Sequence, residues 1–326
     1  MSAASRGAKA IALDAIPVID VAPLGSGGTG GLRSVADALL AAAETIGFCY
    51  VTNHGVPGSL IDDVDRTARQ FFALPEDAKQ ALKPVDRHRG FLSVGQATMR
   101  GSARVDLKES FIWGVDIDPD DADYVNGNRM HGPNHWPAQL PEMRPLFNRY
   151  FAAANTCGRM LLRGFATAMD IAPDTFGRSF SKPVTRCSAV FYPPQSPDAA
   201  QDQFGVAPHT DYGVITVLYQ DPIGGLEVRT RDNEWVIATP IPGTLVINVG
   251  DLLARWTNDR FQSTPHRVVN RSGRERLSIA SFIDPDYDTL IEPVVGAGDA
   301  ARYLATTCGE YILGRFDQSF AYRQGA

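Results

Sequence analysis

The sequence predicts a mainly β protein with flanking helices, built on a double-stranded β-helix (jelly roll) core with one long supporting helix. Two observations carry this prediction. In the second half of the chain, short β-branched and aromatic runs are separated by turn residues, a spacing that suits a jelly roll better than a βαβ series. Just before them, residues 141–170 carry a continuous apolar stripe with helical spacing. With 326 residues and 44% hydrophobic content, the chain can bury a substantial core.

The same patterns divide the chain into three parts. Residues 1–15 are small and polar and are expected to form a flexible tail. Residues 16–140 mix short strands, helices and an irregular stretch, which predicts an N-terminal α/β region packed on the core. Residues 141–326 hold the long helix and the jelly roll. We expect the last two parts to form one integrated unit.

The N-terminal elements follow from local spacing and capping signals. Residues 32–46 place Val35, Leu39 and Ala42 on one helical face, and Gly47 follows at the expected C-cap. A second helix is expected from Ser59, which is a good N-cap residue. The elements predicted in order are a strand and turn at 16–24, a helix at 32–46, a strand at 48–52, a helix at 59–73, a short helix from 75 and a strand at 109–113.

The C-terminal elements are mostly strands. The stripe of the long helix includes Phe147, Ala154, Leu161 and Phe165, and it is continuous enough to lie against a sheet. A final helix is expected at residues 299–315. The strands predicted between these two helices are 188–192, 214–219, 226–229, 235–237, 244–249, 266–270 and 277–283.

Composition excludes several classes of protein. A net charge of −6 with 21% charged residues and no basic block argues against nucleic acid or an anionic membrane as partner. No apolar run suggests a signal peptide or a membrane span. The four cysteines lie far apart without a C-x-x-C pair, as expected of buried thiols in a reducing compartment. The cytoplasm is therefore the expected location.

Three side chains suggest a metal centre. His209 and Asp211 are two residues apart, so in extended chain they would point to the same side. His266 would complete the set if the fold brings its strand alongside. Two imidazoles and one carboxylate are the donors of a facial metal site with open positions, which suits non-haem Fe(II) working on dioxygen.

A second pair of residues suggests an anion site. In the strand predicted around residues 276–282, Arg276 and Ser278 share one face. An arginine in the middle of such a strand is costly to bury unless it meets an anion. Its planar fork suits a carboxylate, and the Ser278 hydroxyl can donate to the same group.

At this point the chain resembles the 2-oxoglutarate- and Fe(II)-dependent dioxygenases, in the branch that includes isopenicillin N synthase and the plant flavonoid and hormone oxygenases. The resemblance covers nearly the whole chain in the expected order. The matching segments are 16–20 (IPVID), 47–55 (GFCYVTNHG), 192–194 (YPP), 224–226 (GGL), Trp235, 242–251 (PGTLVINVGD), 256–258 (WTN), 263–268 (STPHRV) and 276–278 (RLS).

The resemblance implies an enzyme and its cofactors. His209, Asp211 and His266 would bind Fe(II), and O2 and 2-oxoglutarate would be cosubstrates. The far carboxylate of 2-oxoglutarate would pair with Arg276 and Ser278, with Tyr192 adding a hydroxyl. The enzyme would couple oxidative decarboxylation of 2-oxoglutarate, to succinate and CO2, to oxidation of a small organic substrate, most often hydroxylation.

The resemblance also implies where the substrate binds. In the family the irregular 87–140 region borders the mouth of the active site, so Phe111 and Trp113 are candidates for substrate contact, together with Phe282. Plain aromatic core packing is an equally good interpretation of Phe111 and Trp113. The sequence names neither the substrate nor the oligomeric state.

One position departs from the family pattern. Plant members usually carry an Asn two residues before the tyrosine of the Tyr-Pro element, and here that residue is Val190. Contact with the cosubstrate at this point must be weaker or supplied differently. An alternative therefore stays open, namely an Fe(II) oxidase of the isopenicillin N synthase type, which uses its Arg-x-Ser pair to hold the substrate and needs no 2-oxoglutarate.

Two other classes also stay open. Two His and one Asp with water could hold Zn²⁺ in a hydrolase, but that interpretation leaves Arg276 and Ser278 without a task and offers no evident general base. A metal-free binding jelly roll would need three polar residues facing one another inside the barrel with no ion to offset their burial.

Overall fold

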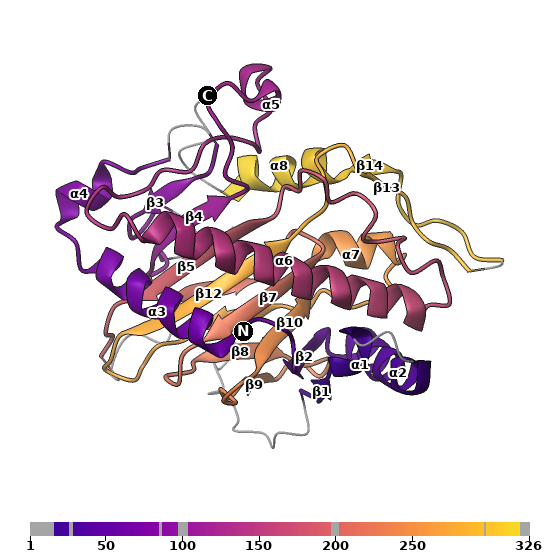
Figure 1. Ribbon diagram of the computed structural model, residues 1–326. Helices are drawn as coiled ribbons and strands as arrows, with labels where there is room; N and C mark the ends of the chain where they lie inside the picture. The colour runs from indigo at the N-terminus through magenta and orange to yellow at the C-terminus, as the bar shows by residue number, and fades with distance from the viewer. Residues whose placement is uncertain are drawn as a thin grey trace.

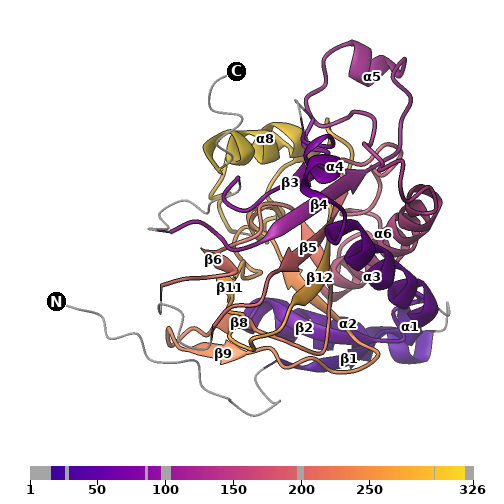
Figure 2. The same ribbon diagram turned by 90° about the vertical axis from the view of Figure 1, so that its left-hand side faces the viewer.

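The computed structural model describes residues 16–25, 29–84, 87–96, 104–196, 202–296 and 298–319. Two sheets face each other, and helices cover the outer side of the larger one (Figures 1 and 2). The larger sheet has the strand order β1-β2-β10-β7-β12-β5-β4-β3, and the smaller has the order β6-β11-β8-β9. This is the mainly β architecture with flanking helices that the sequence predicts. The expected tail, residues 1–15, lies outside the described residues.

The strands fall into three groups. Those of the larger sheet are β1 (Val18–Asp20), β2 (Phe48–Thr52), β3 (Gly90–Leu92), β4 (Glu109–Gly114), β5 (Arg186–Tyr192), β7 (Ile215–Gln220), β10 (Leu245–Val249) and β12 (Arg276–Ile283). Those of the smaller sheet are β6 (Val206–His209), β8 (Leu226–Arg229), β9 (Trp235–Ile237) and β11 (His266–Val268). A separate two-stranded ladder pairs β13 (Leu290–Ile291) with β14 (Thr306–Thr307).

The helices are α1 (Ala22–Gly25), α2 (Thr29–Thr45), α3 (Gly58–Phe72), α4 (Glu76–Gln80), α5 (Ala122–Val125), α6 (Met143–Ala168), α7 (Asp251–Trp256) and α8 (Cys308–Ser319). Helix α2 ends where the sequence predicts. Gly47 has a φ of +68°, and a Cβ there would lie 2.0 Å from the carbonyl oxygen of Gln262. Only glycine fits this left-handed position without displacing the chain.

The long helix α6 supports the larger sheet from outside. It packs on β7 and β12 and also contacts α2 and α3, so that one helix ties the N-terminal region to the sheet (Figure 1). Gly158 allows the close approach, because a Cβ there would lie 2.6 Å from Cγ1 of Ile283 on β12. The main hydrophobic core lies in this layer, between the helices and the outer face of the sheet.

A second, smaller apolar cluster fills part of the space between the two sheets. The larger sheet contributes Tyr50, Val190 and Tyr192, and the smaller sheet contributes Leu226 and Val268. Residues that face this space lie on hydrogen-bonded strands, so the two sheets fix their positions. The candidate site lies here.

The structure corrects the predicted C-terminal helix. Helix α8 begins at Cys308, whereas the prediction begins it at Asp299. The intervening chain is held by tertiary contacts instead: the Asn258 side chain donates to the Ala300 carbonyl and accepts from the Arg302 amide, and Thr306 joins the β13–β14 ladder. These contacts outweigh local helix propensity.

The predicted strands of the second half are all present, with ends shifted by a few residues. The strand β6 and the helix α7 were not predicted, although both border the site. Among the helices in the described part of the chain, none is long and apolar enough to cross a membrane.

Candidate metal centre

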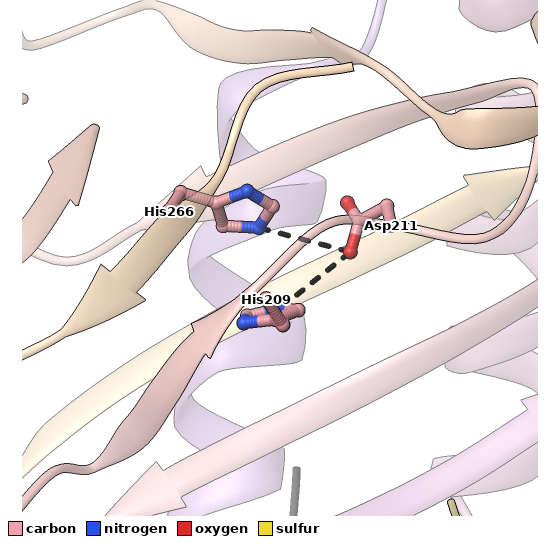
Figure 3. A group of neighbouring side chains, drawn as sticks. All are labelled: His209, Asp211 and His266. Atoms are coloured by element: carbon pink, nitrogen blue, oxygen red, sulfur yellow. Dashed lines mark ion pairs between the residues drawn. The ribbon is translucent and has the colours of Figure 1, made fainter. Parts of the chain in front are cut away.

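The structure brings the three predicted ligands together. His209 is the last residue of β6 and His266 is the first residue of β11, and the two are register partners in the smaller sheet. The Nε2 atoms of both histidines lie 3.7 Å from Oδ1 of Asp211 (Figure 3). One possible ligand atom from each residue lies within 4.8 Å of the others. The donor atoms therefore converge on one point.

The backbone that positions Asp211 differs from the prediction, which places His209 and Asp211 in one stretch of extended chain. Strand β6 ends at His209, so Asp211 lies in the loop that follows and not in continuous extended chain. The Asp211 carbonyl accepts a 2.7 Å hydrogen bond from the Asp251 amide at the start of α7. The unpredicted helix α7 thus helps to fix the loop that carries the carboxylate.

Each imidazole is oriented by a backbone carbonyl. Nδ1 of His209 lies 2.9 Å from the Ala207 oxygen, and Nδ1 of His266 lies 3.1 Å from the Thr264 oxygen. Since a carbonyl can only accept, Nδ1 carries the proton in each ring and donates it. This leaves both Nε2 lone pairs free for a metal, the arrangement usual for metal-binding histidines.

The carboxylate of Asp211 is oriented in the same way. Its Oδ2 accepts from the Thr216 hydroxyl at 2.5 Å and from the Asn248 amide at 2.8 Å. Thr216 lies on β7 and Asn248 on β10, so two neighbouring strands hold one oxygen. Oδ1 is left to face the histidines. The three residues can therefore offer one ligand atom each on one side of an ion.

Electrostatics favour the metal-binding protonation states of His209 and Asp211. Burial, helped by the nearby His266, lowers the pKa of His209, while Asp211 opposes the effect. Burial would raise the pKa of Asp211, but His266, His209 and the two hydrogen bonds outweigh it, and the pKa is lowered. A neutral His209 imidazole beside an ionised Asp211 carboxylate offers the donors that a divalent cation needs.

Arg276 lies in the same cavity as the metal ligands. It is 1% exposed, its Nη1 donates to the Ser278 hydroxyl at 3.2 Å, and its Nε donates to the Gly224 carbonyl. The guanidinium carbon lies 4.6 Å from the centre of the Tyr192 ring, on the neighbouring strand. Among the described residues, Arg276 has no carboxylate partner. The three residues expected to hold a cosubstrate are thus adjacent.

The predicted substrate residues lie in two different environments. Phe282 lines the cavity. Phe111 and Trp113 do not; both are fully buried in the outer core, Phe111 against Phe71 and Trp113 donating to the Phe147 carbonyl at 3.2 Å. The expectation of substrate contact is therefore not met for these two.

Strand alternation explains the difference and could have indicated it. On β4 the even-numbered Ser110 and Ile112 face the cavity, so the odd-numbered aromatic residues face the helices. The sequence reasoning also missed two groups of residues, because no spacing rule reveals which side chains orient a carboxylate or line a cavity. These are Thr216 and Asn248, which orient Asp211, and the cavity-lining cations Lys108 and Arg186.

Two family models match the chain. One, described as the N-terminal part of non-haem dioxygenases in morphine synthesis, matches residues 16–139. The other, the 2OG-Fe(II) oxygenase superfamily, matches residues 184–285, which include all the ligands above. The fold and the site thus define a non-haem iron oxygenase.

Individual proteins similar to this chain point to the same class of enzyme. A homoarginine-6-hydroxylase from Oryza sativa subsp. japonica is 34% identical over 92% of this chain and 95% of its own length. A 2-oxoglutarate-Fe(II) type oxidoreductase from Emericella nidulans is 32% identical over 93% of this chain and 90% of its own. A full-length Neurospora crassa protein, solved in complex with alpha-KG and thymine, superposes with a TM-score of 0.85 at 29% identity, over 96% of this chain and 99% of its own.

The chain belongs to the 2OG-Fe(II) oxygenase superfamily. It is accordingly an oxidoreductase that uses Fe(II) and 2-oxoglutarate, which favours this function over the zinc hydrolase and the metal-free jelly roll. The residues present fit the metal, because the two free Nε2 atoms and the free Oδ1 are the nitrogen and oxygen donors of a facial Fe(II) site.

Proposed function

We propose that His209, Asp211 and His266 hold Fe(II), that Arg276, Ser278 and Tyr192 hold 2-oxoglutarate, and that Phe282 contacts the primary substrate. The enzyme then couples decarboxylation of 2-oxoglutarate to oxidation, most often hydroxylation, of a small organic molecule. Bound iron and cosubstrate supply the oxidising power, while the protein supplies ligation, orientation and exclusion of water.

The burial of Arg276 is the observation that carries the cosubstrate assignment. A guanidinium that is 1% exposed, with no carboxylate beside it among the described residues, holds an uncompensated charge inside the protein. Such a charge is costly unless an anion from outside completes the site. A dicarboxylate can do this with one end while its other end reaches the metal. The adjacent Ser278 hydroxyl and Tyr192 add further polar contact.

The identity of the primary substrate is open within the class of small organic molecules. Similar proteins act on an amino acid, as the name of the homoarginine hydroxylase states, or are solved with a nucleobase, as in the Neurospora crassa structure with thymine. Both belong to the class of small organic molecules, and hydroxylation is the reaction that the first name states. No contact with nucleic acid or membrane is needed for this function.

We assign the N-terminal region, residues 16–140, and the core, residues 141–326, to one catalytic unit. Support comes from β1 and β2, which extend the same sheet as β10, and from β4, which pairs with β5. We also place the protein in the cytoplasm. The four cysteines, all buried and unpaired, are compatible with a reducing compartment.

The test is a succinate-release assay over a panel of small organic compounds, with and without 2-oxoglutarate. Substrate oxidation that depends on 2-oxoglutarate and yields one succinate per product would support the proposal. Oxidation that proceeds without 2-oxoglutarate would favour the isopenicillin N synthase type of reaction, and Arg276 would then bind the substrate.

A further inference from the structure

Strands β5 and β12 form one wall of the cavity, here called its floor, and an arginine lies at each end of this wall. Strands β5 and β12 are antiparallel neighbours, and their cavity-facing residues form cross-strand pairs. The pairs are, in order along the floor, Arg276 with Tyr192, Ser278 with Val190, Ala280 with Ser188, and Phe282 with Arg186. From Arg276 to Phe282 is about 20 Å at a strand rise of roughly 3.3 Å per residue. The two arginines therefore cannot bind the same small group.

Arg186 is built into the cavity wall. It is 5% exposed, and its guanidinium carbon lies 4.5 Å from the ring centres of both Phe282 and Phe316. Two aromatic faces at this distance hold a guanidinium in a defined plane. Because Phe316 lies on α8 and lines the cavity, the C-terminal helix helps to form this end of the cavity.

Few of the donors of Arg186 are used. Nη1 donates to Oδ2 of Asp284 over a long 3.4 Å, and the described residues offer its other N–H groups no acceptor. The other oxygen of Asp284 accepts from the Val214 amide at 2.8 Å, and only Oδ2 takes the contact from the arginine. Since Arg186 lines the cavity, its remaining N–H groups are a polar feature that this end offers to a ligand. His88 and Tyr212 also line the cavity there, next to Phe316.

The charge of Arg186 is already balanced, unlike that of Arg276. Asp284 is fully buried, and burial raises its pKa to about 6 although Arg186 opposes the rise. The ion pair with Arg186 and the hydrogen bond from the Val214 amide both favour the ionised form of Asp284, which offsets the guanidinium. A second carboxylate brought to Arg186 would meet the field of Asp284, whereas a neutral oxygen would accept a hydrogen bond without that repulsion.

We propose that the Arg186 end of the cavity is the primary-substrate pocket, and that it selects a neutral carbonyl oxygen, as in an amide, lactam or ketone, over a carboxylate. This rests on the proposed function, in which the Arg276 end holds the cosubstrate. The apolar surroundings of Phe282, Phe316 and Ile112 suit an otherwise flat and uncharged body.

The test compares benzamide with benzoate, which share a ring and differ in charge. Each is titrated by calorimetry, without oxygen, into the protein loaded with Fe(II) and 2-oxoglutarate. The wild type should bind benzamide more tightly than benzoate. Arg186→Lys keeps the charge beside Asp284 but loses the planar guanidinium, so the affinity for benzamide should fall about tenfold or more.

Arg255→Lys is the matched control for this change. Arg255 also lies over two aromatic rings, those of Tyr303 and Tyr311, but it is outside this cavity, so benzamide binding should stay unchanged. A failure of the wild type to bind benzamide, or equal binding by Arg186→Lys, would overturn the proposal.

Asp284→Asn tests the charge argument separately. It keeps the shape and the acceptor for the Val214 amide but removes the balancing charge, so the preference should reverse in favour of benzoate. An unchanged preference would contradict the role given to Asp284. A titration with 2-oxoglutarate alone reports whether the Arg276 end binds the cosubstrate. A failure of the cosubstrate site at Arg276 can therefore be distinguished from a failure of the substrate pocket at Arg186.

Discussion

At the residue scale, hydrogen bonds from the protein leave one atom of each metal ligand free. Both Nδ1 atoms donate to backbone carbonyls, and Oδ2 of Asp211 is occupied by Thr216 and Asn248. What remains is a set of three donor atoms that could hold one side of an ion and leave its other positions to a cosubstrate and dioxygen. The ligand set could be predicted from residue types, whereas the groups that orient it could not.

Removal of a ligand tests this assignment. His209→Ala or Asp211→Ala should abolish Fe(II) binding and turnover, because two donors cannot hold the ion, while the far-UV circular dichroism of the metal-free protein stays unchanged. Iron content after loading and succinate release are the measurements. His135→Ala, at an exposed histidine, is the control and should behave as wild type. Full activity in either ligand variant would show that the assignment is wrong.

Arg276→Lys tests the cosubstrate site. A point charge cannot replace the planar fork, so the KM for 2-oxoglutarate should rise by about tenfold or more. Steady-state kinetics against 2-oxoglutarate measure the change, with Arg129→Lys at an exposed surface ion pair as control. If the dependence on 2-oxoglutarate stays the same, Arg276 binds something else.

At the element scale, the alternation of residues along each strand decides which side chains reach the cavity. The sequence indicates that residues 109–113 form a strand, and the structure agrees. It does not say which face is inward, so Phe111 and Trp113 are candidates for substrate contact, with core packing as the open alternative. The inward face instead carries Ser110 and Ile112, which line the cavity. The aromatic side chains lie on the opposite face and fill the core layer beneath the helices.

Strand β7 contributes to the metal centre through Thr216. Thr216→Val keeps the shape but removes the hydroxyl that holds Oδ2 of Asp211, so the carboxylate gains freedom to turn. Affinity for Fe(II) should fall by about 10- to 100-fold, the usual cost of losing such a supporting contact. Anaerobic metal competition measures it. Thr257→Val, at a buried threonine just after α7 whose hydroxyl bonds only backbone groups, should leave iron affinity intact.

The contact between α6 and β12 can be tested with two glycines. Gly158→Ala places a Cβ 2.6 Å from Ile283, which should cost about 1–3 kcal/mol and outweigh the gain in helix propensity of about 1 kcal/mol. Gly314→Ala on α8 meets nothing within 4 Å, so it should be neutral or stabilising. Urea unfolding curves compare the two. A stabilised Gly158→Ala variant would contradict the close packing.

At the scale of the whole molecule, the site exists because distant segments meet. His209 and His266 become neighbours through the β6–β11 pairing, and Arg276 meets Tyr192 through the β5–β12 pairing. The strands and the order of the motifs could be predicted from the sequence. The pairing of Arg186 with Asp284, the role of α7 and the start of α8 could not, because each depends on contacts between residues far apart in the chain.

Chelation of 2-oxoglutarate by the bound iron can be measured directly, by an anaerobic titration of the Fe(II)-loaded protein with 2-oxoglutarate followed by visible absorption. We expect a metal-to-ligand charge-transfer band that grows and saturates in the wild type, needs more 2-oxoglutarate in Arg276→Lys, and is absent in Asp211→Ala. If the wild type holds iron and shows no band at any concentration, 2-oxoglutarate does not chelate the metal in this protein, and the assignment of Arg276, Ser278 and Tyr192 to the cosubstrate is contradicted.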